Sequence, residues 1–263
     1  MNKLIKINTL ILITIFSFVY TDKIIEYLNK KDPLMIKLED IKEDYKVEVV
    51  NSYIEDDTII PGMIGKEVEV DKSYNNMKEG KIFREENLIF KDIYPSELLK
   101  DNKDKYIVKG NKDNKVSLLY IINKDNINIS NKNITLFINH NYLTIENITK
   151  YKDNEIYSYG NNGIYNKDIL VNDNTLINRL SNNNSNYCLT RDKNIKVLEV
   201  CQSMNMNTII PNIIGNYLDI KNNLSSGSII LLEDINNLDI IIKYISSKGY
   251  NIVPLSNLLK EAY

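Results

Sequence analysis

The stretch Ser226-Gly227-Ser228-Ile229-Ile230-Leu231-Leu232-Glu233-Asp234 decides the fold of this chain. A serine and glycine turn precedes four consecutive apolar residues, which is typical of a short buried strand, and two carboxylates follow it. A second apolar strand is predicted at residues 251–254, after a helical run at residues 237–247. A strand, a helix and another strand in this order predict a βαβ unit of a parallel sheet.

Short apolar segments alternate with helical runs from residue 116 onward. The opening stretch contributes the strand at residues 228–232, and the other predicted strands cover residues 116–122, 134–138, 155–159, 186–189 and 208–211. The other predicted helices cover residues 142–150, 168–180 and 195–204. Seven strands with helices between them predict an α/β fold, a distorted or partial (β/α)7 barrel. Such barrels place their chemistry at the carboxyl ends of the strands.

The N-terminus has the layout of a secretory signal. Within residues 1–22, Lys3 and Lys6 precede an uncharged run at residues 7–20. Residues 18–20 are bulky and offer no cleavage site, so the sequence predicts an uncleaved signal anchor. The two lysines favour an N-terminus inside the cell and a body outside it. A buried N-terminal helix is the alternative.

The segment between the anchor and the barrel lacks the strand and helix alternation. Residues 23–57 are charged and mixed, and we predict a stalk. Residues 58–110 are predicted to form a small α+β extension, with a short helix capped by Asp71 and ended by Gly80. The barrel domain then covers residues 111–263.

Composition excludes several classes of protein. The chain of 263 residues is 43% hydrophobic and 26% charged, as in globular proteins. A net charge of −2 gives no basis for a nucleic-acid partner. One histidine and two cysteines are too few for a structural zinc site, which needs about four such ligands. In an exported protein Cys188 and Cys201 could form a disulfide, but two buried thiols are the interpretation we favour.

The stretch at residues 226–234 resembles the last βαβ unit of the polysaccharide deacetylases, carbohydrate esterase family four with its NodB-type homology domain. That family writes G-S-I-I-L-L-H-D here, and then K-G-Y-x-F-V-x-L-S-E-L-L. This chain has Glu233 at the histidine position, retains Asp234 and continues as K-G-Y-N-I-V-P-L-S. The resemblance covers about residues 115–260. Residues 60–83 are similar to an extension found ahead of some deacetylase-like proteins.

Active members of the family hold a divalent metal with two histidines and an aspartate, and use a second aspartate as general base and a histidine as general acid. At the T-F-D-D-G motif this chain has Ile121 for the base and Ile122 for the metal ligand. At the H-S/T-x-x-H motif it has Tyr159 and Gly163 for the two metal histidines. The one histidine, His140, lies in a loop and is expected to be exposed or at the edge of the core.

The resemblance therefore implies a deacetylase scaffold with no catalytic residue, no metal and no other cofactor. Around the former site we expect five polar residues: Asn123, Asn161, Tyr187, Arg191 and Asp234. Glu233 and Asp234 are adjacent, and neighbouring strand residues point to opposite faces, so they are not expected to form an acid and base pair.

We expect an exported, single-pass membrane protein with its body on the extracellular side, which binds peptidoglycan or another envelope protein. The alternative is an active, divergent N-deacetylase of peptidoglycan or chitin type. It would use Glu233, Asp234, Asp125 and Asn161 with a divalent ion. A third interpretation is a purely structural envelope protein.

Overall fold

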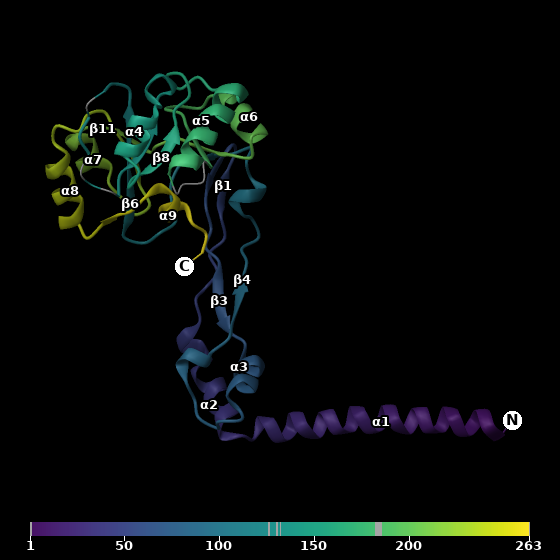
Figure 1. The fold of residues 1–263 in the computed structure, drawn as a ribbon. Helices are drawn as coiled ribbons and strands as arrows, with labels where there is room; N and C mark the ends of the chain where they lie inside the picture. The colour runs from purple at the N-terminus through teal and green to yellow at the C-terminus, as the bar shows by residue number, and fades with distance from the viewer. Residues whose placement is uncertain (1, 126, 130, 132, 182–185, 263) are drawn as a thin grey trace. The chain divides into compact units, whose positions relative to one another are not determined.

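The structure, a computed structural model, describes residues 2–125, 127–129, 131, 133–181 and 186–262. The side chains of residues 2–10, 12 and 26 also lie outside the described part. The chain divides into two compact units, Met1–Val49 with Gly65–Ile93, and Val50–Ile64 with Tyr94–Tyr263. The predicted boundaries at residues 57 and 110 do not coincide with this division, because residues 50–64 join the second unit (Figure 1).

The second unit contains two sheets. The larger has the order β11-β12-β6-β7-β8, with β13 also paired to β6, and all of its pairs are parallel. Its strands are β6 (Lys115–Ile122), β7 (Thr135–Ile138), β8 (Glu155–Ser158), β11 (Ile213–Gly215), β12 (Ile229–Leu232) and β13 (Asn251–Ile252). The smaller has the order β1-β2-β5-β10-β9, and only β1 and β2 are antiparallel. Its strands are β1 (Tyr53–Glu55), β2 (Thr58–Ile60), β5 (Tyr106–Ile107), β9 (Tyr187–Leu189) and β10 (Asn207–Ile209).

Hydrophobic cores lie on both faces of β6, because successive strand residues point to opposite sides. Tyr120 and Ile122 contact the core that is covered by helices. Leu119 and Ile121 contact a second core, to which both sheets contribute. That shared core includes Phe137, Tyr157, Leu189, Ile209 and Leu231. In the described residues no strand pair joins the two sheets. The α/β class with parallel sheets is therefore confirmed, whereas the strand pairs of the described residues do not close into a ring.

All seven predicted strands and all four predicted helices of this unit are present. The helices are α4 (Ile145–Lys150), α5 (Lys167–Leu180), α6 (Ile195–Ser203), α7 (Tyr217–Asn223), α8 (Leu238–Ser247) and α9 (Leu255–Leu259), with the 3-10 turns η3 (Leu99–Asp101) and η4 (His140–Tyr142). Asparagine or threonine side chains cap four of these helices by accepting backbone N–H groups. Three elements, β11, α7 and α9, were not predicted from the sequence.

A disulfide joins Cys188 of β9 to Cys201 of α6. Both residues are fully buried, beside Leu170 and Val197. The Cα atoms lie 6.4 Å apart, within the range that a disulfide spans. The favoured interpretation of two buried thiols is therefore wrong: packing of α6 against β9 brings the two side chains together.

The first unit is built from helices and one strand pair. Its elements are α1 (Asn2–Lys30), α2 (Pro33–Ile41), η1 (Lys42–Tyr45), β3 (Gly65–Val68), α3 (Val70–Met77), η2 (Glu85–Asn87) and β4 (Phe90–Ile93), and β3 pairs antiparallel with β4. Asp32 caps α2 by accepting from the backbone N–H of Leu34 at 2.8 Å. Much of the predicted stalk is thus helical. The cap of α3 is Glu69, and Asp71 lies in its first turn, so the predicted cap is wrong.

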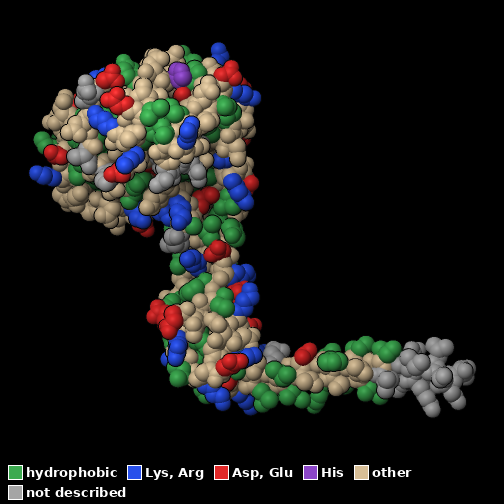
Figure 2. Space-filling view, in the orientation of Figure 1, with side chains coloured by type: hydrophobic (Ala, Val, Ile, Leu, Met, Phe, Trp, Pro, Cys, Tyr) green, Lys and Arg blue, Asp and Glu red, His purple; other side chains and the backbone are tan. Residues whose placement is uncertain are grey.

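The predicted signal anchor falls within α1. None of the helices, as far as their residues are described, is long and apolar enough to cross a membrane. Large apolar side chains of α1 are nevertheless exposed, among them Phe16 at 71% and Phe18 at 68% (Figure 2). Lys3 and Lys6 lie outside the described side chains.

Candidate functional site at the carboxyl ends of the strands

A cavity of about 450 Å³ opens at the carboxyl ends of β6, β8, β9 and β12. Its lining includes Tyr120, Ile121, Asn123, Tyr159, Arg191 and Glu233. We call it the mouth cavity. Residues from these four strand ends are far apart in the sequence, and the parallel arrangement of the strands brings them to one edge. This is the edge at which an α/β barrel carries its active site.

The two isoleucines that end β6 face different environments. Ile121 points into the core between the two sheets and reaches the mouth cavity. Ile122 points to the other face, is fully buried under helices and does not line the cavity. Neither side chain has a lone pair, so this strand end offers no base and no metal ligand.

The loop after β8 carries the other two positions at which the family has metal ligands. Tyr159 lines the cavity, and so does Asn162, whereas Asn161 and Gly163 do not. Gly163 has a positive φ of 81°. A Cβ at that position would lie 3.0 Å from the phenol oxygen of Tyr159. The tyrosine therefore fills the space above the glycine, and the pair offers a metal only one phenol oxygen.

Glu233 and Asp234 line the same cavity, contrary to the expectation that they point to opposite sides. The reason is that β12 ends at Leu232, so both carboxylates lie in the loop beyond the pleated strand. Glu233 lies 3.9 Å from Arg191, and both side chains are about half exposed, which makes this a weak ion pair. Asp234 accepts from the backbone N–H of Asn236.

Two of the tyrosines near the site are buried. Burial raises the pKa of Tyr120, and the negative charge of Asp234 raises it further. Tyr187 does not line the mouth cavity: it is 8% exposed and its ring lies edge-on to Tyr157 at 5.3 Å. Burial raises the pKa of Tyr187 well above its usual range. Of the five polar residues expected around the site, the cavity therefore brings together Asn123, Arg191 and Asp234.

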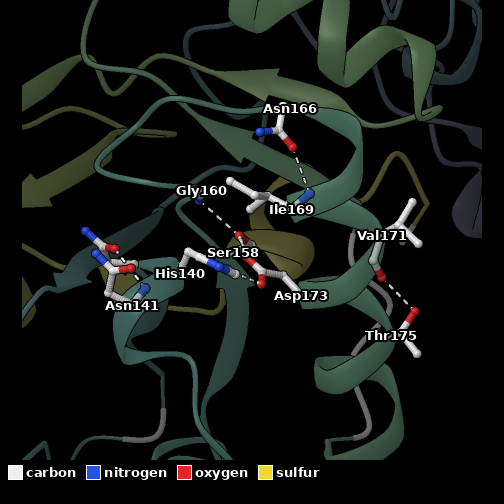
Figure 3. A network of polar contacts seen from close by, with 10 residues as sticks. His140, Asn141, Ser158, Gly160, Asn166, Ile169, Val171, Asp173 and Thr175 are labelled. Carbon is white, nitrogen blue, oxygen red and sulfur yellow. Dashed lines mark hydrogen bonds and ion pairs between the residues drawn. The ribbon is translucent and has the colours of Figure 1, made fainter.

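A hydrogen-bonded cluster, shown in Figure 3, holds the loop after β8 in place. The carboxylate of Asp173, a 3% exposed residue of α5, accepts from Ser158 at 2.5 Å and lies 2.7 Å from His140 Nδ1. The backbone N–H of Gly160 donates to Ser158 Oγ, and the carbonyl oxygen of Gly160 accepts from the backbone N–H of His140. We call these four residues the loop clamp. The sequence predicted His140 to be exposed or at the edge of the core, and nothing in it pointed to the buried partner Asp173.

The loop clamp is not a nucleophilic triad. In a Ser-His-Asp triad the histidine lies between the serine and the aspartate. Here Ser158 and His140 both contact the carboxylate of Asp173, one through each oxygen. Ser158 is also 1% exposed and cannot meet a substrate. The cluster therefore serves to position Tyr159 and Asn162, which come next along the chain.

The residues at the mouth do not fit the divalent metal of the active deacetylases. Zinc sites take imidazole, thiolate and carboxylate ligands. Three of the five substituted positions, Ile121, Ile122 and Gly163, have no donor atom in a side chain. Over the described residues no group of three or more His, Cys, Asp or Glu side chains is arranged to hold a metal ion.

Solved structures share this fold. The wild-type BA3943 protein of Bacillus anthracis, a CE4 family pseudoenzyme, superposes with a TM-score of 0.58 and 19% identity, over 88% of this chain and 96% of that one. A BA3943 mutant, also described as a CE4 family pseudoenzyme, gives a TM-score of 0.59 at 19% identity, over 88% and 99%. That coverage exceeds the share of the chain in the second unit, so the likeness extends into the first.

Sequence comparison gives one relative of unknown role. The uncharacterized protein YlxY of Bacillus subtilis is 35% identical over 96 residues, which is 35% of this chain and 29% of that protein. No protein-family model matches the chain. The chain therefore shares the fold of these family-four (CE4) structures, and the positions at which the resemblance places the family's catalytic groups hold other residues.

Proposed function

We propose that this protein is a catalytically inactive, deacetylase-like protein that binds a glycan of the cell envelope in its mouth cavity. The observation that carries the proposal is the combination of an open, polar cavity with the loss of donor atoms at Ile121, Ile122 and Gly163. Loss of chemistry with retention of the cavity favours binding over turnover. The likeness to BA3943, described as a pseudoenzyme, supports this interpretation.

The lining of the mouth cavity suits a sugar with acetamido groups. Sugar hydroxyls and amides both donate and accept hydrogen bonds, and asparagine side chains do the same. The amide side chains that line the cavity are Asn123, Asn128, Asn162 and Asn236. Tyr120 and Tyr159 also line it, and an aromatic ring with a hydroxyl can pack against a sugar ring and bond to it. Peptidoglycan and chitin-type oligomers have this chemistry.

One observation favours the alternative of a divergent deacetylase, since Glu233 and Asp234 share the mouth cavity. Against it, the two other residues that such an enzyme was expected to use, Asp125 and Asn161, do not line the cavity. A purely structural protein would need neither the cavity nor its polar lining.

Binding of N-acetylated peptidoglycan fragments and chitin oligosaccharides to the full chain, measured by calorimetry, tests the proposal. Arg191→Ala and Asp234→Ala should each weaken binding about tenfold, because both side chains line the cavity. Lys221→Ala, on the exposed side of α7, should leave it unchanged. Release of acetate in the presence of divalent metal would establish the alternative. Absence of glycan binding, with capture of a protein partner, would favour the structural interpretation.

We further propose that the protein is exported and attached to the membrane through residues 1–22, with its body on the extracellular side. The buried disulfide supports export, because disulfides persist in oxidising compartments. The exposed apolar side chains of α1 support attachment. Protease treatment of intact cells, followed by alkaline extraction of membranes, tests both points. A protease-protected body, or a chain that alkaline extraction releases, would contradict them.

A further inference from the structure

A second cavity lies at the opposite, amino-terminal ends of the strands of the second unit, and has a volume of about 1160 Å³. Three lysines line it: Lys112 in the loop before β6, Lys115 at the start of β6, and Lys260 after α9. We call it the lysine cavity. It shares no residue with the mouth cavity, so its chemistry is independent of the proposed glycan binding.

The three ammonium groups act on one another. Lys112 is only 8% exposed, and its Nζ donates to the carbonyl oxygen of Ala262 at 2.8 Å. Burial lowers the pKa of Lys112, and the positive charges of Lys115 and Lys260 lower it further. Like charges that line one cavity repel each other, and an anion between them would relieve the repulsion.

Among the described residues, few carboxylates line the cavity with these lysines. Asp113 is the one carboxylate in the described lining, and it is exposed to solvent, where salt screens its charge. Within the described part of the chain Asp113 forms no ion pair, and neither Lys115 nor Lys260 has a carboxylate oxygen within 4 Å. Two of the three cations are therefore available to a ligand.

Neutral donors complete the cavity. Asn111, Ser256 and Asn257 line it, and in the described residues no hydrogen bond uses their side chains. Ammonium, amide and hydroxyl groups all donate to phosphate oxygens, and lysine binds phosphate as a point charge. The lining described has no arginine, whose planar fork favours carboxylates. We propose that the lysine cavity binds a phosphate group, carried either by an anionic polymer or by a lipid headgroup.

Calorimetric titration of the full chain with inorganic phosphate, at ionic strength held constant with chloride, tests the proposal. The double variant Lys115→Gln/Lys260→Gln should bind phosphate about tenfold more weakly. The matched pair Lys221→Gln/Lys243→Gln changes the net charge equally on exposed faces of α7 and α8, and should change binding less than twofold. Linear polyphosphate in one arm, and phosphatidylglycerol against phosphatidylcholine vesicles in another, identify the source of the phosphate.

Equal weakening by both lysine pairs, or no phosphate binding by the unmodified chain, would overturn the proposal. Should the first pair fail to fold, as judged by its urea midpoint, Asn257→Ala provides a milder change in the same lining and should still weaken binding. Arg191→Ala in the mouth cavity should leave phosphate binding intact. Failure of the glycan proposal can therefore be distinguished from failure of this one.

Discussion

The phenol oxygen of Tyr159 lies 3.0 Å from the position that a Cβ on Gly163 would take. These are the two positions at which active deacetylases of this fold are expected to hold the metal with histidines. Gly163 also has a φ of +81°, which side chains rarely adopt. The two positions are thus sterically coupled, and a side chain at residue 163 requires the phenol of Tyr159 to move.

Gly163→Ala should destabilise the second unit by about 1–3 kcal/mol, from backbone strain together with the contact to Tyr159. Gly249 provides a matched control, because it has the same φ of +81° and an added Cβ would meet nothing within 4 Å. The difference between the two glycine variants in urea unfolding isolates the steric part. In a Tyr159→Ala background that difference should vanish. Equal costs for both glycines would refute the coupling.

The strands and helices that the sequence predicted share one physical property. Each is an apolar run bounded by turn or cap residues. A run of this kind can be recognised from the local sequence pattern alone. The helix α7 was not predicted because its N-cap, Asn216, is one of many asparagines in the chain. Only the structure shows that Asn216 forms a capping box with Asp219.

The site was less predictable, because contacts between distant segments decide it. The substituted positions could be found by comparing motifs. The contact between Tyr159 and the space beside Gly163, however, depends on a loop with several positive φ angles. The burial of Tyr187 depends on its packing against Tyr157 from another sheet. The pairing of Cys188 with Cys201 depends on how α6 packs on β9.

Reduction of the disulfide should lower the free energy of unfolding by about 3 kcal/mol, the entropic value for a closed loop of this length. The urea midpoint of the oxidised protein is compared with that of protein that has been unfolded, reduced and then refolded in the presence of reductant. The reduced protein should have the lower midpoint. Cys188→Ala/Cys201→Ala should match the reduced form and not respond to reductant. Equal midpoints for the oxidised and reduced chain would show that the crosslink adds nothing to stability.

Asp173→Asn should cost about 1–3 kcal/mol, because a buried carboxylate that accepts from Ser158 and contacts His140 loses its charge. It should also loosen the loop after β8, which faster amide exchange at Gly160 would report. Thr175→Ala is the control on the same helix. Its hydroxyl donates to Val171 on the exposed face, and its loss should be nearly neutral (Figure 3). Unchanged exchange at Gly160 would mean that the loop clamp does not hold the loop.

The stability of the second unit should depend on pH through Glu261. Burial raises the pKa of this carboxyl above its ordinary value of about 4.5, although the N–H that Leu99 donates to it at 2.9 Å acts in the opposite direction. A group whose pKa is higher in the folded state binds its proton more tightly there. Its contribution to stability is therefore present below pH 4.5 and is lost as the pH rises through the folded pKa.

Glu261→Gln keeps an oxygen that can accept from Leu99 and removes the charge. It should match the unmodified chain in urea midpoint at about pH 4, where the carboxyl is protonated, and exceed it at pH 7, where ionisation costs the native state free energy. The two pH values serve as controls for each other, since a change in packing alone would shift the midpoint equally at both. A variant less stable at neutral pH would mean that the ionised carboxylate is favoured by its bond to Leu99 more than burial disfavours it.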